Sequence, residues 1–149
     1  MSDKSMKEVC KVIDINKDAC NFYKAAQLEA KDETVKGIFK NFEQLHSGVV
    51  IDLQNYVTQH GGNPEADSTV TGIVGQVWGE VKAKLSSEPD ESLISSLEEA
   101  EDRCIHSIKD AIKDDGISAE ARTTLKRQEA TLQKSHDYMK IMKENAKAA

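Results

Sequence analysis

The residues in this sequence best suited to chemistry are two acids and a histidine in helical contexts. Glu43 and His46 stand three residues apart in a stretch whose apolar residues recur at helical spacing. Glu101 lies in the middle of the apolar stripe of another such stretch. A helical bundle holds two metal ions with a carboxylate from each of two helices and a Glu-x-x-His from each of the others. Glu43-x-x-His46 is one intact copy of that motif, which indicates a carboxylate-bridged metal site.

The remainder of such a ligand set is incomplete. His136 occurs in Gln133-x-x-His136, where glutamine replaces the glutamate of the motif. The first helical stretch has no acid on its apolar side, because Asp18 is expected to face solvent and leaves Asn16 or Cys20 there. No catalytic residue is predicted. The predicted metal ligands are Glu43, His46, Glu101 and His136, with iron, manganese or zinc as the metal.

A metal-free alternative explains the same residues. A buried Glu101 must be paired or protonated, because an isolated buried carboxylate is costly. The side chains available as its partners are those of His46, His136, Tyr23 and Asn16. Perturbed buried groups are often structural, so we favour a hydrogen-bonded polar network, while the metal site stays open as the competing interpretation.

Apolar periodicity predicts four long helices and one short helix. The long helices are expected at about residues 6–30, 33–60, 90–114 and 118–144, and the short one at about 70–85. Asp32 and Ser118 are the expected N-caps of the second and fourth long helices, because their side chains can accept hydrogen bonds from the first turn. Gly61-Gly62-Asn63-Pro64 ends the second.

Two helical hairpins joined by one long connection predict an all-α, ferritin-like four-helix bundle, with residues 1–149 as a single domain. In that topology the second and third long helices run in the same direction from the same end. Glu43 and Glu101 then lie at one level, about ten residues along their helices. The polar layer expected at that level comprises Asn16, Cys20, Tyr23, Glu43, His46, Glu101, Cys104 and His136.

Composition narrows the classes of partner. The net charge of −6 argues against nucleic acid, because phosphate binding requires a basic patch. No apolar run reaches the about 20 residues that span a bilayer, and no signal peptide follows the first Met, so no membrane partner is expected. The three cysteines have no CxxC spacing, which favours reduced thiols and a cytoplasmic location.

Several short motifs resemble a family of uncharacterised bacterial proteins with a ferritin-like bundle, a domain of unknown function. The motifs are Asp18-x-x-x-Phe22-Tyr23-x-Ala25-Ala26, Asp52-Leu53-Gln54 with Gly61 to Pro64, the Trp78 segment, Leu97 to Asp102, and His136-Asp137. The resemblance covers nearly the whole chain. It implies the fold and no established activity, although a stress-related role is suspected for such proteins.

The sequence therefore supports three alternative hypotheses of function. The first is a non-enzymatic ferritin-like bundle, stress-related and metal-binding. The second is a di-metal carboxylate protein with oxidase or storage-like activity, although Gln133 and the missing helix-one carboxylate depart from that pattern. The third is a structural interaction module that forms a homodimer or higher oligomer.

Overall fold

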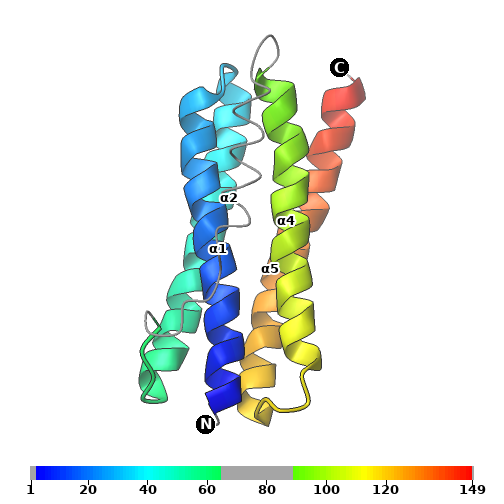
Figure 1. The fold of residues 1–149 in the computed structure, drawn as a ribbon. Helices are drawn as coiled ribbons and strands as arrows, with labels where there is room; N and C mark the ends of the chain where they lie inside the picture. The colour runs from blue at the N-terminus through cyan, green and yellow to red at the C-terminus, as the bar shows by residue number, and fades with distance from the viewer. Residues whose placement is uncertain (1–2, 65–88, 149) are drawn as a thin grey trace.

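The computed structural model describes residues 3–64 and 89–148, and every regular element in those ranges is an α-helix (Figure 1). The helices are α1 (Asp3–Glu29), α2 (Glu33–Gln59), α4 (Pro89–Lys113) and α5 (Ala119–Ala148). The prediction of an all-helical chain with four long helices is confirmed for these residues. α1 begins earlier and α5 ends later than expected. The predicted short helix at 70–85 lies outside the described residues.

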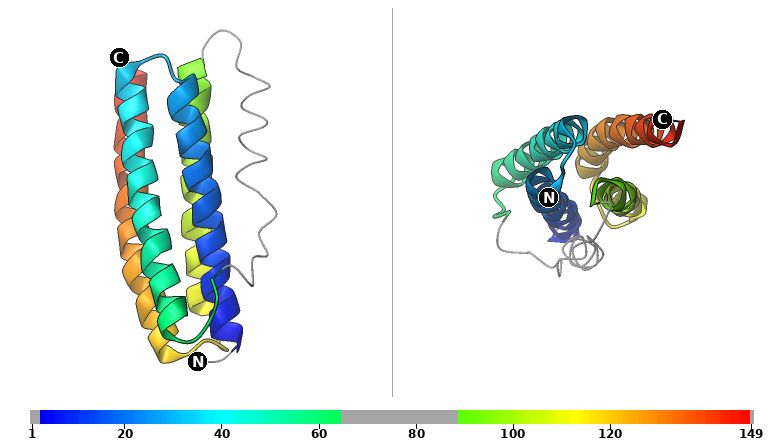
Figure 2. Two further views of the ribbon diagram at one scale, coloured as in Figure 1. Left: turned by 90° about the vertical axis from the view of Figure 1, so that its left-hand side faces the viewer. Right: turned by 90° about the horizontal axis from the view of Figure 1, so that it is seen from above.

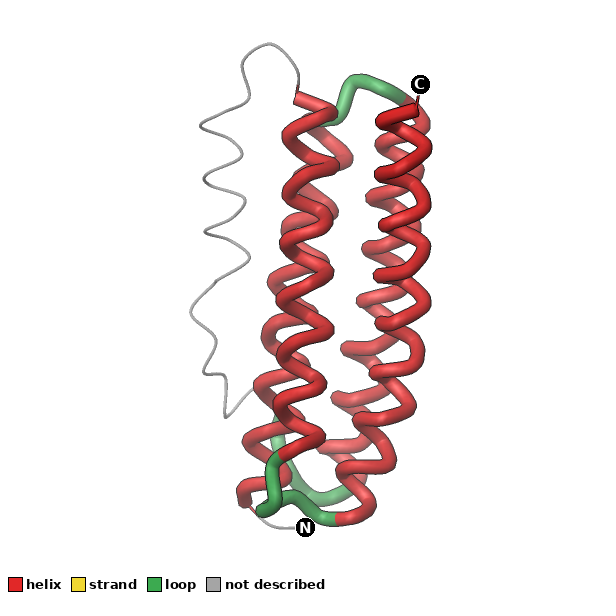
Figure 3. Tube along the Cα trace, turned by 90° about the vertical axis from the view of Figure 1, so that its right-hand side faces the viewer, coloured by secondary structure: helices red, strands yellow, loops and turns green. Residues whose placement is uncertain are grey.

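The four helices form two antiparallel hairpins, α1 with α2 and α4 with α5 (Figures 1 and 3). α2 and α4 run in the same direction, so the end of α2 and the start of α4 lie at opposite ends of the bundle. Seen along their axes, the helices occupy four corners, with α2 diagonally across from α4 (Figure 2). α1 packs on both α2 and α4, whereas α5 packs mainly on α4 and only sparsely on α2.

Side-chain caps and a glycine define the helix ends as the sequence predicted. Asp32 accepts hydrogen bonds from the backbone N–H groups of Thr34 and Val35 and thereby caps α2. Ser118 Oγ accepts from the N–H of the third residue of α5. Beyond α2, Gly61 adopts φ +79°, a left-handed conformation that glycine enters without steric cost.

Two polar contacts join the hairpins and set their relative height. The Asp90 carboxylate, at the start of α4, accepts hydrogen bonds from the backbone N–H groups of Lys31 and Asp32 at 2.8 and 2.9 Å. The α4 N-terminus is therefore level with the joint between α1 and α2. At the opposite end, Ser5 Oγ accepts from the N–H of Ser118 at 2.7 Å. Residues equally far along α2 and α4 consequently lie at about the same height in the bundle.

The core is apolar and runs the length of the bundle. Its largest fully buried side chains include Ile13, Phe22, Tyr23, Phe39, Leu53, Leu93, Leu97, Ile108, Leu125, Leu132 and Met139. Within the described ranges, no helix is both long enough and apolar enough to cross a membrane. A few polar side chains interrupt this core at mid-height, and they form the candidate site.

Candidate functional site

The ring of His46 is held from one side by Asn16 of α1. His46 is fully buried, and its Nδ1 lies 2.6 Å from Oδ1 of Asn16. The Asn16 amide nitrogen donates to the backbone carbonyl of Val12 at 2.8 Å. A carbonyl oxygen only accepts, so this bond fixes the orientation of the amide and leaves its oxygen facing the ring. Nδ1 of His46 therefore carries a hydrogen and donates it to Asn16.

The other side of the same ring faces Glu101 of α4. His46 Nε2 lies 2.9 and 3.1 Å from the two carboxylate oxygens, and Glu101 is 1% exposed. Ser135 of α5 donates its hydroxyl hydrogen to Glu101 Oε1 at 2.8 Å. Because Nδ1 is already a donor, Nε2 and Glu101 share a single proton, either as imidazolium and carboxylate or as imidazole and carboxylic acid. We call the connected set Asn16, His46, Glu101 and Ser135 the central network.

Helix register explains why these side chains meet. His46 lies 13 residues after the start of α2, and Glu101 lies 12 residues after the start of α4. The contacts of Asp90 place the two starts at the same height. At about 1.5 Å per residue, the two side chains are then almost level in the bundle. The predicted layer of polar groups at mid-height is therefore where the helix directions put it.

Glu43 does not join the central network. Three residues correspond to about 300° of helical rotation, so Glu43 and His46 diverge by about 60° around α2. The Glu43 carboxylate turns toward α1, where it accepts from Gln27 at 3.1 Å and lies 3.9 Å from the Lys24 ammonium. Its side chain is 17% exposed. The Glu-x-x-His motif is present in sequence, but its acid is a peripheral hydrogen-bonding group.

His136 is also directed elsewhere. Its Nε2 lies 2.5 Å from Oδ1 of Asp102, whose side chain is 57% exposed. Its Nδ1 is buried and makes no hydrogen bond in the described part of the chain. Gln133 donates to Asp137 on its own helix. The structure thus brings together His46 and Glu101 of the four predicted ligands and places Glu43 and His136 against other partners.

Tyr23 and two cysteines border the central network. The Tyr23 ring packs edge-on against His46 with centroids 5.4 Å apart, and its buried hydroxyl has no hydrogen-bond partner among residues 3–64 and 89–148. Burial, followed by the nearby Glu101 carboxylate, raises the pKa of the Tyr23 phenol well above its ordinary value. The same two causes raise the pKa of the Cys104 thiol. Burial also raises the pKa of Cys20. These groups stay protonated at neutral pH.

The central network does not fit a metal centre as arranged. A histidine ligand needs an unprotonated ring nitrogen facing the ion, with the other nitrogen held by a hydrogen bond. In His46 both nitrogens face protein side chains, Asn16 and Glu101. In the described ranges no group of three or more histidine, cysteine, aspartate or glutamate side chains is gathered to hold a metal ion. The assignment of four metal ligands remains a prediction that the geometry does not support.

Asp18 departs from its predicted exposure. It was expected to face solvent, yet it is half-buried, and its Oδ2 makes no hydrogen bond within the described residues. Asp14, one turn earlier, is also buried. Burial raises the pKa of the Asp18 carboxyl, and repulsion from Asp14 raises it further. α1 therefore has acids near its buried side. Asp14 and Asp18 share a face of the helix because they are four residues apart, whereas Asn16 is two residues from each and lies on a different side.

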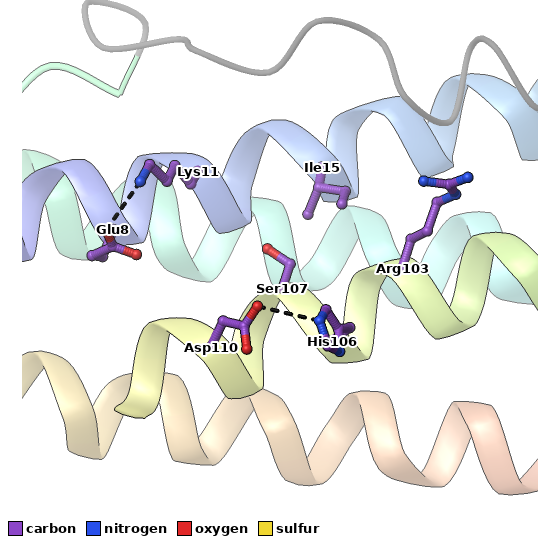
Figure 4. A pocket seen from close by; sticks show the side chains of 7 residues that line it. All are labelled: Glu8, Lys11, Ile15, Arg103, His106, Ser107 and Asp110. Atoms are coloured by element: carbon purple, nitrogen blue, oxygen red, sulfur yellow. Dashed lines mark hydrogen bonds and ion pairs between the residues drawn. The ribbon is translucent and has the colours of Figure 1, made fainter. Parts of the chain in front are cut away.

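The surface groove between α1 and α4 does not supply a second polar site. A groove of about 350 Å³ lies between α1 and α4 (Figure 4). In it Lys11 pairs with Glu8 at 3.1 Å, and His106 pairs with Asp110 at 3.3 Å. Arg103 pairs with an acid of its own helix at 3.0 Å. Each basic group is matched by an acid one turn away, so the groove offers no uncompensated charge to an anionic ligand.

A smaller groove lies between α2 and α5 and touches the central network. Its volume is about 150 Å³, and its walls include Phe42, Leu45, Ser135 and Tyr138. The rings of Phe42 and Tyr138 are 6.1 Å apart. Ser135 donates to Glu101, so a member of the central network forms part of the lining of this apolar groove.

Two partners in the site were missed by reasoning from the sequence. Ser135 precedes His136 and lies three residues after the core residue Leu132, which is the only signal for an inward hydroxyl. Asp102 follows Glu101, but nothing in its spacing identifies it as the partner of His136.

One comparison with known proteins gives a match. A family model described as Domain of unknown function (DUF2383) matches residues 5–114. The matched range contains Asn16, His46 and Glu101 and ends before Ser135. No curated protein and no solved structure matches this sequence.

Proposed function

We propose that this chain, which belongs to the DUF2383 family of domains of unknown function, is a ferritin-like bundle that acts by binding a partner and not by catalysis. In this proposal the central network is closed and metal-free, and it fixes the packing of the helices. Buried polar networks of this kind specify a unique packing when every member is satisfied.

Helix directions support the ferritin-like part of the proposal. Ferritin-like folds contain two helical hairpins joined by one long crossover, which makes the second and third bundle helices parallel. α2 and α4 have that relationship here, and 29 residues separate Gln59 from Pro89. A simple up-and-down bundle would instead make these two helices antiparallel.

The observation that carries the functional part is the saturation of His46 and Glu101. Both ring nitrogens and both carboxylate oxygens have protein groups within hydrogen-bond distance. An acid or base that acts on a substrate must reach that substrate's proton, and these atoms lie at 0–1% side-chain exposure. We therefore assign these residues to specifying how the helices pack and not to acting on a substrate.

The experiment that tests this proposal is a metal measurement combined with an assay. Protein purified without chelator or affinity tag is analysed by elemental mass spectrometry, before and after incubation with ferrous iron, manganese or zinc. We expect less than stoichiometric metal and no iron-dependent oxygen consumption. Stoichiometric metal that disappears in both His46→Gln and Glu101→Gln, with helicity retained, would overturn the proposal.

The di-metal carboxylate function is the competing proposal. It is favoured by two buried polar atoms that lack partners among the described residues, the Tyr23 hydroxyl and Nδ1 of His136. A rearranged layer would use such groups. The same experiment separates the two proposals, because only the competing one requires Glu43 and His136. Glu43→Gln and His136→Gln would then lower metal content as well.

A further inference from the structure

The outer face of α2 has a glycine that its own bundle does not use. Gly48 lies in the interior of α2 and is exposed, and a Cβ atom added there would have no atom within 4 Å from the rest of the described chain beyond the adjacent backbone of α2 itself. Glycine inside a helix costs about 0.5–1 kcal/mol relative to alanine. The chain therefore carries a destabilising residue where alanine has room. Glycine at such a position permits the close approach of another backbone, and no backbone among residues 3–64 and 89–148 makes that approach.

Residues around Gly48 repeat in mirror order along α2. Asn41 and Asn55 each lie seven residues from Gly48, and Gln44 and Asp52 each lie four residues from it. These offsets place all five residues within about 40° of one line along the helix. All five are exposed. We call them the α2 outer stripe.

The mirror order makes the α2 outer stripe complementary to itself. When two copies of α2 lie antiparallel with Gly48 against Gly48, Asn41 is level with the partner's Asn55, and Gln44 is level with the partner's Asp52. Amides pair with amides through one donor and one acceptor each, and an amide donates to a carboxylate. Asp52 is the one charged member, and it meets an amide rather than a second acid. No like charges oppose each other in this arrangement.

Apolar side chains flank the stripe. Ile51 is 56% exposed, and the half-buried Leu45 lies at the same three-residue distance on the other side of Gly48. On the adjacent α5, Tyr138 and Ile141 are 50% and 56% exposed. Leu45 and Tyr138 also line the apolar groove between α2 and α5. Exposed apolar surface of this kind is found at protein–protein contacts.

We propose that the α2 outer stripe is the two-fold interface of a homodimer, in which the two α2 helices cross antiparallel at Gly48. A two-fold contact uses the same patch on both subunits, so it requires a self-complementary surface. Missing Cβ atoms at the crossing let the helix axes approach to the lower end of the usual about 8–10 Å. The inference rests on the proposed function, because it names the partner of a protein that acts by binding.

The first test measures oligomeric state on the full chain. Sedimentation equilibrium of the wild type is compared with Gly48→Arg and with Ser95→Arg, an exposed position on α4 diagonally across the bundle. We expect the wild type and Ser95→Arg to dimerise equally. Gly48→Arg should raise the dimer Kd by at least about tenfold while circular dichroism shows unchanged helicity. A wild type that is monomeric at every concentration, or a Gly48→Arg dimer as tight as the wild type, would overturn the interface.

A second test examines the antiparallel register. The double variant Asn41→Cys, Asn55→Cys should form an intermolecular disulfide on mild oxidation, whereas Asn41→Cys alone should not. Native cysteines do not interfere, because all three are buried. Cross-linking by Asn41→Cys alone to the same extent would contradict this register. A monomeric wild type would overturn the interface without changing the result of the metal experiment. Metal-dependent turnover by a dimeric protein would overturn the proposed function and leave the interface standing.

Discussion

Asn16 and His46 form a fully buried contact between α1 and α2: Oδ1 of the amide accepts the hydrogen of ring Nδ1 at 2.6 Å. The backbone carbonyl of Val12 holds the other end of the amide. This one contact fixes the tautomer of the ring and so determines what His46 offers to Glu101.

Asn16→Ala should destabilise the protein by about 1–3 kcal/mol, because it leaves the buried Nδ1 of His46 without a partner. Urea denaturation followed by circular dichroism measures the change in the free energy of unfolding. Asn21→Ala is the matched control, since Asn21 is exposed on the same helix, and its effect should stay within about 0.5 kcal/mol. Equal effects of the two substitutions would show that the contact with His46 contributes nothing.

Ser135→Ala should cost about 1–2 kcal/mol, because Glu101 loses its hydroxyl donor in a buried environment. Ser95→Ala, at an exposed position of α4, gains the same helix propensity without losing a buried bond. The difference between the two unfolding free energies isolates the hydrogen bond. A Ser135→Ala protein as stable as Ser95→Ala would remove Ser135 from the network.

Asp90→Ala should loosen the junction between the hairpins. Its carboxylate holds the N–H groups of Lys31 and Asp32, and loss of a comparable helix cap costs about 0.5–2 kcal/mol. Hydrogen exchange gives the local measurement: the amides of Lys31 and Asp32 should exchange faster in the variant. Glu91→Ala, an exposed acid in the same turn, should leave both rates unchanged. Unchanged rates in Asp90→Ala would contradict the capping role.

Asp18→Asn should stabilise the protein more at neutral than at acid pH. Burial, and then Asp14, raise the pKa of the Asp18 carboxyl in the folded state. The folded state thus binds this proton more tightly than the unfolded state, so Asp18 reduces stability as pH rises from its ordinary pKa through the raised one. Unfolding free energies of both proteins at about pH 3 and about pH 7 test this. A gain that is equal at both pH values would contradict it.

Sequence reasoning recovered the elements because their signals are strong. Apolar periodicity over more than twenty residues defines each described helix, and Asp32, Ser118 and Gly61 mark ends that the structure confirms. The order of helices and the common level of α2 and α4 then brought His46 to Glu101. That common level depends on Asp90, which accepts hydrogen bonds from residues 58 and 59 positions earlier in the chain. Residue spacing within one helix does not reveal contacts over such separations.

Rotation about the helix axis explains what the sequence did not predict. Glu43 and His46 lie within one turn of each other on the same helix, but about 60° of rotation sends one to α1 and the other to the centre. On α5, consecutive residues differ by about 100°, so Ser135 reaches Glu101 while His136 reaches Asp102. A periodic apolar pattern identifies the inward face of a helix, but that face includes neighbouring residues, and the pattern does not show which of them points to the bundle centre. Interhelical packing decides which of them reaches the centre.

The most direct test of a closed, metal-free network is the protonation of the His46 ring in solution. Nitrogen-15 NMR of the imidazole reports on Nδ1 and Nε2 separately, and His46→Gln assigns the signals. The network predicts a protonated, slowly exchanging Nδ1, with both nitrogen shifts unchanged when equimolar zinc or ferrous iron is added. An unprotonated Nδ1, or a stoichiometric metal-induced shift of either nitrogen that is absent in Glu101→Gln, would contradict it.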